Sequence, residues 1–380
     1  MQKIQANRKV IFFTNIIAPY RVFLFNELEK VSKENSFDFE VYFMRETESN
    51  RDWNIDKNNI RFKYKVGNGL YFRIKSYFGH FNPILIFNLI KNNEEIILGA
   101  SWNNLNVLLI ALLKTCGIIK NKLSIWTEAN YMTNESQQKN KFRDILKKWF
   151  FSKIDGNFVV PGKMATISFD KWGIPYKNIV IFPNLVNDKV FRREIPYNNY
   201  MDQLPIFFIV ARLEENIKGI KNFLIAIGLN NTKKIMLRIA GTGASLNEYI
   251  NYVRTNDLEK NVVFLGNLTE EEISKEYKKS NVFVLPSFSD PSPLTIVEAI
   301  HSGLPVLISE RCGNHFETVE EGENGYIFDP LDHEETKSKF EKLLENRYLW
   351  NKFSEKSCRI ANKNFNPQNS LRNFIKLYNK

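Results

Sequence analysis

The sequence has little of what builds cross-linked or membrane-spanning proteins. Its 380 residues include three cysteines, Cys116, Cys312 and Cys358, which lie far apart without paired spacing. This spacing argues against a disulfide framework or a cysteine-based zinc site, so we expect the cysteines to be buried apolar residues. Apolar runs are short, because the run "VLLIALL" at 107–113 falls far below the roughly 20 residues that span a bilayer. The N-terminus has no apolar core or cleavage site of a signal peptide, which predicts a cytoplasmic location.

Residue patterns typical of metal sites are also missing from the sequence. The chain contains no Asp-x-Asp pair, and its four histidines, at 80, 301, 315 and 333, are not spaced as metal ligands. Divalent metal is the usual means of neutralising a departing diphosphate, and it needs clustered carboxylates. We therefore expect no metal and no cofactor, so that cationic side chains of the protein carry out any such neutralisation.

The charge of the chain is strongly uneven. The formal net charge is +11, and the composition of 43% hydrophobic and 25% charged residues is that of a globular protein. Residues 1–190 contain 28 Lys and Arg against 17 Asp and Glu, whereas residues 191–380 contain 25 of each. The whole excess lies in the first half, which indicates an anionic partner such as a membrane surface, a polyphosphate or nucleic acid.

Strand and helix patterns alternate along both halves, which predicts an α/β fold with parallel sheets. At this length two domains are expected. We place the first domain at 1–184, a polar, asparagine-rich linker at 185–204 and the second domain at 205–360. The last segment, 361–380, is expected to form a helix that packs back on the first domain. Two facing α/β domains imply a cleft between them.

The stretch "VFVLPSFSDPSPLTIVEAIHSGLPVLIS" at 282–309 predicts a strand, a sharp loop, a helix and a second strand. Ser292 is expected to cap the helix and Pro293 to be its first residue, with the helix running to about Ser302. In a parallel sheet this loop lies at the carboxyl edge, where ligands bind. The free N–H groups of Leu294 and Thr295 would then favour an anion.

Further residues of the second half fall at the same predicted edge. Arg212 follows the first strand of this domain and Lys218 precedes the next helix, so that both would suit a diphosphate, although a solvated basic loop has the same pattern. The sequence "IAGTG" contains Gly241 and Gly243, which fit a tight turn as well as a close approach to a ligand. Asn267 and Leu268 end another strand and could offer backbone groups to a flat base.

Taken together, these motifs resemble the retaining GT-B glycosyltransferases of family four, glycosyl transferases group 1. The resemblance is carried by Arg212, Lys218, "IAGTG", "VVFLGNL", the 282–309 stretch and "ERCGNHFETVEEGENGYIFD", and upstream by "IIAPYRVFLFNEL" and "FVVPGKMATISFDKWGIPYKNIVIFPNLVNDKVF". It implies two facing Rossmann-like domains, the first binding the acceptor and the second the nucleotide-sugar donor. The family hallmark is Glu, seven residues, Glu, and here Asp290 and Glu298 keep this spacing with Asp in the first position. The interval from Arg212 to Lys218 is one residue longer than is common.

The resemblance also implies roles for residues. Asp290 would contact the transferred sugar, Glu298 would accept hydrogen bonds from the ribose diol, and the N–H groups after Ser292 would hold the leaving diphosphate together with Arg212 and Lys218. The implied activity is metal-independent transfer with retention. The donor would be a nucleotide diphosphate sugar, with UDP favoured, and the acceptor a saccharide or polyprenyl-linked glycan in surface polysaccharide or lipooligosaccharide synthesis.

The first half offers candidate contacts for the acceptor and for a membrane. The loop "TNIIAPYR" brings Asn15 and Arg21 to a cleft edge, where Pro19 can start a helix and Arg21 would suit a phosphate-bearing ligand. Glu128 in "IWTEAN" would end a strand at the same edge and contact the sugar or acceptor. The basic helix predicted at 139–153 carries an apolar stripe, which fits either packing on its own domain or peripheral attachment to the cytosolic face of an inner membrane. The stripe comprises Phe142, Ile145, Leu146, Trp149 and Phe150.

Two other classes of function remain open from the sequence. One is a nucleotide-sugar epimerase or hydrolase of similar fold, which would need an acid and a base beside the sugar. The other is a sugar-nucleotide-binding module without activity, in which Asp290 marks a drifted motif. Nucleic-acid binding is not expected, although the basic half leaves it as a remaining use.

Overall fold

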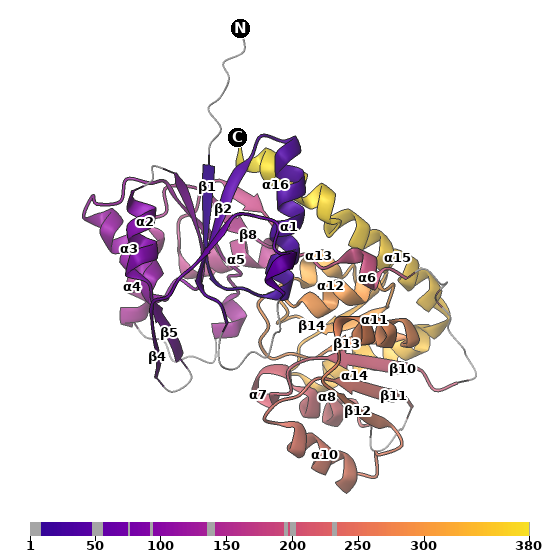
Figure 1. The fold of residues 1–380 in the computed structure, drawn as a ribbon. Coiled ribbons are helices and arrows are strands. Elements are labelled where there is room, and N and C mark those ends of the chain that lie inside the picture. Colours follow the sequence, from indigo (N-terminus) through magenta and orange to yellow (C-terminus); the bar gives the residue numbers. More distant parts are fainter. Residues whose placement is uncertain are drawn as a thin grey trace.

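The computed structural model describes residues 9–47, 56–74, 77–91, 94–134, 141–193, 197, 203–229 and 234–379. Two α/β domains lie side by side and are bridged by the C-terminal helices (Figure 1). The expected α/β fold with two Rossmann-like domains is therefore confirmed.

The first domain is built on a parallel sheet of seven strands in the order β3-β2-β1-β6-β7-β8-β9. Both faces of this sheet are covered, so its strands are apolar nearly throughout. The strands are β1 (Lys9–Ile16), β2 (Asp38–Arg45), β3 (Tyr64–Val66), β6 (Glu95–Gly99), β7 (Leu123–Trp126), β8 (Phe158–Val160) and β9 (Ile179–Ile181). The helices are α1 (Pro19–Glu34), α2 (Pro83–Ile90), α3 (Leu105–Thr115), α4 (Lys141–Phe151) and α5 (Lys163–Trp172), and α6 (Asp188–Phe191) follows in the linker.

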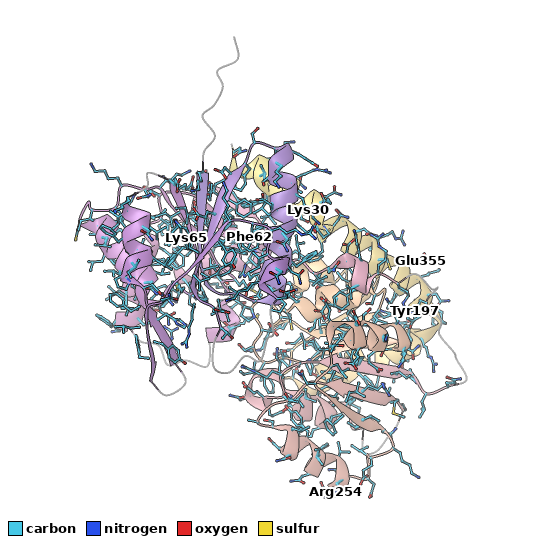
Figure 2. All side chains as sticks on the ribbon, viewed as in Figure 1. Lys30, Phe62, Lys65, Tyr197, Arg254 and Glu355 are labelled. Atoms are coloured by element: carbon cyan, nitrogen blue, oxygen red, sulfur yellow. The ribbon has the colours of Figure 1, made fainter. Side chains whose placement is uncertain are left out.

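The basic, aromatic segment at 61–81 forms β3 and an antiparallel hairpin of β4 (Leu70–Ile74) and β5 (Tyr77–Phe81), which the sequence reading did not anticipate. Phe62 from this segment lies inside the domain near α1 (Figure 2), with its ring centroid 5.3 Å from that of Phe25. Short 3-10 turns occupy Lys57–Asn59 and Tyr131–Asn134.

The second domain has six parallel strands in the order β12-β11-β10-β13-β14-β15. The strands are β10 (Ile206–Val210), β11 (Met236–Ala240), β12 (Val262–Gly266), β13 (Val282–Leu285), β14 (Val306–Ser309) and β15 (Gly325–Phe328). The helices are α7 (Glu215–Lys218), α8 (Ile220–Ala226), α10 (Leu246–Thr255), α11 (Glu270–Lys279), α12 (Leu294–His301), α13 (His315–Thr318) and α14 (His333–Glu345), followed by a 3-10 turn at Asn346–Leu349. In both sheets the chain starts at a central strand, extends one way and then returns to the other side, which creates a switch point where ligands bind.

Two long C-terminal helices connect the domains. Helix α15 (Trp350–Asn364) packs on α12 and α13 of the second domain, and α16 (Pro367–Tyr378) packs on α1 and β9 of the first. The ring of Phe374 in α16 stacks on Phe182 with a centroid distance of 4.2 Å. One buried apolar cluster consequently runs from the first domain through α16 into the second.

The linker region packs on the second domain where the structure describes it. Helix α6 contacts α11 and α12. The Tyr197 hydroxyl donates to the carbonyl of Asn281 at 2.9 Å, and Figure 2 places Tyr197 beside this domain. Of the three cysteines expected to be buried, Cys312 is buried and Cys358 is half-buried. The expectation was wrong for Cys116, which is exposed because it is the C-cap residue of α3.

Candidate active site

The two loops that carry the predicted chemistry leave adjacent strands at the switch point of the second sheet. Strand β10 lies between β11 and β13 in the sheet and precedes Arg212 and Lys218. Strand β13 precedes Asp290. Because the strands are parallel, both loops emerge at the carboxyl edge. The sheet topology therefore explains why residues so far apart in sequence come together here.

Lys218 and Asp290 form an ion pair. Their side chains are 15% and 14% exposed, so the pair is largely withdrawn from solvent. Gly219, which follows Lys218, has a φ of 60°, and a side chain there would come within 2.7 Å of the Pro286 carbonyl. The N–H of Phe288 donates to the Ile217 carbonyl at 2.8 Å, which ties the Asp290 loop to the end of α7.

The main chain at Asp290 is braced from both domains. The N–H of Gly313 donates to the Asp290 carbonyl at 2.9 Å, which pairs this loop with the one after β14. Asn130 belongs to the first domain and is 2% exposed. Its side-chain amide points toward the Asp290 loop. Its Nδ2 donates to the Arg311 carbonyl at 3.2 Å and lies 3.5 Å from the Asp290 carbonyl. Asn130 thus links the first domain to the Asp290 loop, and no local pattern in its sequence signals this.

Arg212 lies at the surface of the same edge. Its guanidinium contacts Glu214 through Nε at 3.0 Å and Nη2 at 3.1 Å, and its side chain is 49% exposed. We expected Arg212 and Lys218 to present two cations to an anion. Each of them instead holds a carboxylate, so a diphosphate would have to share or displace these partners.

Helix α12 begins one residue later than expected. Its N-cap is Pro293 and its first residue is Leu294, whereas the sequence had placed the cap at Ser292. Asn314 Nδ2 donates to the Pro293 carbonyl at 2.9 Å, which holds Pro293 in an extended conformation outside the helix. The N–H groups of Leu294 and Thr295 lie in the first turn, where they lack partners within the helix. The helix ends at His301, and Gly303 follows with a φ of 67°.

Glu298 faces a hydroxyl from a neighbouring helix. The Tyr277 hydroxyl of α11 lies 3.0 Å from Glu298 Oε2 and 2.9 Å from the Thr295 carbonyl. A tyrosine has one proton to donate, so a protonated Glu298 would satisfy the second contact. Burial raises the pKa of Glu298 to about 7, which makes that protonated form accessible near neutrality. Tyr277 was not identified from the sequence, where it reads as an apolar position of α11.

Gly241 and Gly243 allow two loops to pass closely. A side chain at Gly241 would lie 1.9 Å from the Ala211 carbonyl, and one at Gly243 would lie 2.3 Å from the Leu213 carbonyl. Close packing against the loop of Arg212 therefore explains why both positions are glycine.

The two residues that follow β12 differ in burial. Asn267 is exposed, and Leu268 is half-buried against the core. Both lie beyond the carboxyl end of β12, at the far edge of the second sheet.

The candidate residues of the first domain lie at the carboxyl ends of β1 and β7. Helix α1 begins at Pro19 as expected, and the Arg21 guanidinium stacks 3.7 Å above the Trp126 ring. Arg21 Nη1 is buried and has no hydrogen-bond partner in the part of the chain that the structure describes. Glu128 accepts a hydrogen bond from Asn184 Nδ2 at 2.7 Å, and Asn15 is half-buried near the end of β1.

The predicted apolar stripe of the basic helix is divided in the structure. Phe150 of α4 is buried, whereas Phe142 and Ile145 are 73% and 67% exposed. Lys147 is buried instead, with its ammonium 4.2 Å from the Trp172 ring centroid, and burial lowers its pKa. The first residues of the predicted range, 139–140, lie outside the described residues.

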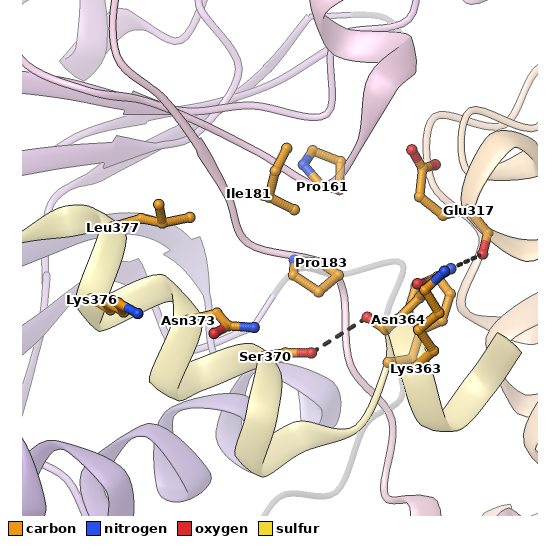
Figure 3. Close-up of a pocket in the computed structure, with 11 residues that line it drawn as sticks. Pro161, Ile181, Pro183, Glu317, Lys363, Asn364, Ser370, Asn373, Lys376 and Leu377 are labelled. Carbon is orange, nitrogen blue, oxygen red and sulfur yellow. Dashed lines mark hydrogen bonds between the residues drawn. The ribbon is translucent and has the colours of Figure 1, made fainter. Parts of the chain in front are cut away.

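A cavity of about 390 Å³ lies where the domains and α16 meet (Figure 3). Its lining includes Pro183, Glu317, Asn364 and Ser370, and none of the candidate site residues. Glu317 Oε1 accepts the N–H of Lys163 at 2.8 Å, so a residue of the second domain caps α5 of the first.

Metal-binding clusters and membrane-spanning helices are both absent from the described ranges. No three His, Cys, Asp or Glu side chains there come together in a way that could hold a metal ion. No helix there combines the length and apolar character needed to cross a membrane.

Comparison with known proteins identifies the family of the second domain. Residues 192–360 match the family model described as glycosyl transferases group 1. This match covers the second domain. The whole chain is 23% identical to an uncharacterised glycosyltransferase of Methanocaldococcus jannaschii, with 98% of each chain covered. It is 38% identical over 99 residues to the sulfoquinovosyl transferase of Arabidopsis thaliana.

Alignments with the first curated relatives span only 19% to 37% of those relatives' length. Among solved structures, sucrose-phosphate synthase from Thermosynechococcus elongatus superposes on this chain with a TM-score of 0.72 and 16% identity, covering 98% of both chains. Anabaena HepE in complex with UDP superposes with a TM-score of 0.71 and 13% identity, covering 95% of this chain and 97% of that one. These neighbours share the GT-B fold.

Proposed function

We propose that this chain moves a sugar from a nucleotide diphosphate sugar to a saccharide or polyprenyl-linked glycan, with retention and without metal. The observation that carries the proposal is the meeting of Lys218 and Asp290 at the switch point of the second sheet. A fixed cation beside a carboxylate suits a site that binds a sugar hydroxyl on one side and a departing phosphate on the other.

The donor diphosphate would lie between Lys218 and the first turn of α12. Lys218 supplies a point charge, Arg212 a fork, and the N–H groups of Leu294 and Thr295 the positive end of the helix dipole. Lys218 would share its charge between Asp290 and the diphosphate, while Arg212, being half-exposed, can turn from Glu214 at little cost. We favour UDP as the nucleotide, because a structural neighbour holds UDP in the same fold.

Glu298 would bind the ribose diol. As a carboxylate it can accept a hydrogen bond at each oxygen. Tyr277 orients Oε2 from behind and leaves the other oxygen for a ligand. Asp290 would accept a hydrogen bond from a hydroxyl of the transferred sugar, and its pairing with Lys218 fixes the direction of that bond.

The transfer step would proceed on one face of the sugar. The acceptor oxygen forms a bond to the anomeric carbon while the bond from that carbon to the phosphate oxygen breaks, and its electron pair leaves with the diphosphate. The hydroxyl proton passes to the leaving phosphate oxygen. Lys218 and the α12 N-terminus stabilise the negative charge that grows on the diphosphate. Asp290 acts as a positioning group for the sugar and not as a nucleophile.

The acceptor would lie against the first domain. Asn15 and Arg21 near β1 and Glu128 after β7 line the carboxyl edge of its sheet. The buried, unpartnered Nη1 of Arg21 supports a contact with a phosphate or another acceptor oxygen. Glu128, held by Asn184, would accept a hydrogen bond from a hydroxyl.

We further propose that the first domain lies on the anionic cytosolic face of a membrane. Helices α2, α3 and α4 form the side of this domain that faces away from the second domain (Figure 1). Large apolar side chains of these helices are exposed, namely Ile84, Phe87, Leu112, Phe142 and Ile145. Exposed apolar groups among lysines suit an interfacial surface. This position would give access to a lipid-linked glycan for surface polysaccharide or lipooligosaccharide synthesis.

Turnover assays test the proposal against its alternatives. The full chain is incubated with UDP-sugars and GDP-sugars and a mixture of lipid-linked and free glycans. Transfer with retained configuration supports the proposal. Conversion of the donor without an acceptor would indicate the epimerase or hydrolase, and nucleotide binding without turnover would indicate a binding module.

A further inference from the structure

A separate pocket of about 260 Å³ lies at the carboxyl end of β2 in the first domain. It is enclosed by the ends of β2 and β3, by the hairpin β4–β5 and by the start of α2. Arg45, Gly67, Tyr71 and Asn82 line it. None of the residues assigned above to the donor or the acceptor does so.

Arg45 brings a cation to this pocket, and no carboxylate of the described residues pairs with it. Its guanidinium lies 4.0 Å from the Tyr71 ring centroid, and Nη1 is buried without a hydrogen-bond partner among those residues. The carboxylate that also lines the pocket, Glu46, forms an ion pair with Lys57 at 2.7 Å. An arginine stays protonated in a protein, so the unsatisfied donor cannot be relieved by loss of charge.

Asn82 supplies a second donor without a partner. It is 2% exposed and is the N-cap residue of α2. Its Oδ1 accepts the N–H of Gly69 at 3.1 Å, which fixes the orientation of the amide. Nδ2 is then left buried without an acceptor. A buried donor of this kind is costly unless something fills the place of the acceptor.

The surroundings favour an anion over a neutral ligand. The N-terminus of α2 begins at Asn82, so its first-turn N–H groups and the helix dipole add positive character. A side chain at Gly67 would lie 2.3 Å from Asn82 Oδ1, and one at Gly69 would lie 2.0 Å from the Phe81 carbonyl. Both glycines therefore let the loop after β3 close on Asn82.

We propose that this pocket binds a phosphate or carboxylate group of the glycan acceptor, through Arg45 and Asn82, an inference that rests on the proposed transferase function. Strand β2 is three strand intervals from β7, which carries Glu128, a separation of about 14 Å. The group recognised is consequently remote from the reacting hydroxyl. It would make the enzyme selective for a charged acceptor without taking part in the chemistry.

Binding of small anions to the full chain tests this without turnover. The probes are methyl phosphate, methyl glucuronide and the neutral methyl glucoside, followed by ligand-observed NMR. Arg45→Gln removes the charge, and Asn82→Asp keeps an oxygen that accepts the N–H of Gly69 but places a negative charge in the pocket. Arg61→Gln is the matched control, an exposed arginine of the same domain. Because the proposed donor site would also bind phosphate, the informative quantity is the difference in dissociation constant between wild type and each variant.

We expect the dissociation constant of at least one anion to rise about tenfold or more in Arg45→Gln and in Asn82→Asp, which corresponds to the loss of one charge-assisted contact. Arg61→Gln and the neutral probe should show no change. If Arg45→Gln does not fold, Arg45→Lys keeps the charge without the fork and should weaken binding less than Asn82→Asp.

The relative affinity of the phosphate and the glucuronide identifies the source of the anionic group. The inference would be overturned if wild type, Arg45→Gln and Asn82→Asp bound each anion with the same affinity. It would also be overturned if wild type bound neither anion. Sugar transfer is measured separately, so its absence would count against the proposed function alone.

Discussion

The ammonium of Lys218 pairs with the carboxylate of Asp290 across 72 positions of sequence, with both side chains largely buried. Removing one partner from such a pair leaves an uncompensated charge in a poorly hydrated place. The pair therefore fixes the two loops of the switch point relative to each other before any donor arrives. This preorganisation is what a site for charge development requires.

Replacing Lys218 by alanine should reduce the turnover number roughly 10² to 10³-fold, the scale for one preorganised contact to developing charge. The measurement is the initial rate of sugar transfer at saturating donor. Lys221→Ala is the control, because Lys221 pairs with Glu248 at 2.7 Å on the surface and lies on the same segment. A Lys218→Ala enzyme as fast as Lys221→Ala would remove Lys218 from the site.

The affinity for nucleotide should depend on pH through Glu298. Its pKa is raised from 4.5 to about 7 by burial, so the neutral form dominates below about 7 in the free enzyme. The ionised form accepts hydrogen bonds from the ribose diol at the oxygen that Tyr277 leaves free, and affinity should consequently rise between pH 6 and 8. Calorimetric titration with UDP over this range provides the test. Glu298→Gln should bind more weakly and keep only the slope that comes from ionisation of the terminal phosphate of UDP, so a slope equal to that of wild type would contradict the assignment.

The ionisation of Glu298 should also affect folding stability, which should fall as the pH rises whereas the affinity for nucleotide should increase. Because the folded protein holds the proton of Glu298 more tightly than the unfolded chain, its contribution is fully present below pH 4.5 and is lost as the pH rises through about 7. The melting temperature of the free wild type should therefore fall relative to that of Glu298→Gln as the pH rises across this interval, because glutamine does not ionise. Parallel melting curves across the interval would show that burial does not raise this pKa.

Asn130→Asp should slow transfer without weakening nucleotide binding. The substitution keeps the oxygen that accepts the N–H of Met132 at 3.0 Å but replaces the donor to Arg311 by a second acceptor. Oxygen would then face the carbonyls of Arg311 and Asp290, which pushes the Asp290 loop away. We expect about a tenfold or larger drop in turnover with the dissociation constant of UDP unchanged. A loss of UDP affinity equal to the loss of rate would indicate general damage to the second domain.

Membrane attachment should depend on the exposed apolar residues of α4. Burying a phenylalanine and an isoleucine contributes about 1.5–3 kcal/mol each, so replacing Phe142 and Ile145 by serine should reduce binding to liposomes at least tenfold. The measurement is flotation with vesicles containing anionic phosphatidylglycerol. Leu331→Ser is the control, because Leu331 is 61% exposed in the second domain. Equal loss in both variants would place the attachment elsewhere, and retained DNA binding without vesicle binding would favour nucleic acid as the partner of the basic half.

The sequence predicted the second domain well because its signals are local. The apolar run of β13 and the proline-rich loop that follows it both lie within a short window. Arg212, Lys218 and Asp290 could be placed at one edge because parallel strands share a direction. The start of α12 was misplaced by one residue, since the contact that holds Pro293 comes from Asn314 in a distant loop.

Side-chain contacts could not be predicted in this way. Glu214 lies two positions from Arg212 in sequence, yet only the folded loop shows that its carboxylate contacts the guanidinium. The contact of Asn130 with Arg311 joins two domains, and that of Tyr277 with Glu298 joins two helices. The hairpin of β4 and β5 was not predicted, because its pairing brings together two short strands whose basic and aromatic residues lack a clear alternating pattern.

The central claim is that cations of the second domain, without a divalent ion, hold the diphosphate as it leaves. The most direct test is the initial rate of sugar transfer in EDTA for wild type and for the double variant Arg212→Ala, Lys218→Ala. The account predicts an unchanged rate for wild type and a rate at least 10²-fold lower for the double variant. Full activity in the double variant, or loss of wild-type activity in EDTA that manganese restores, would contradict it.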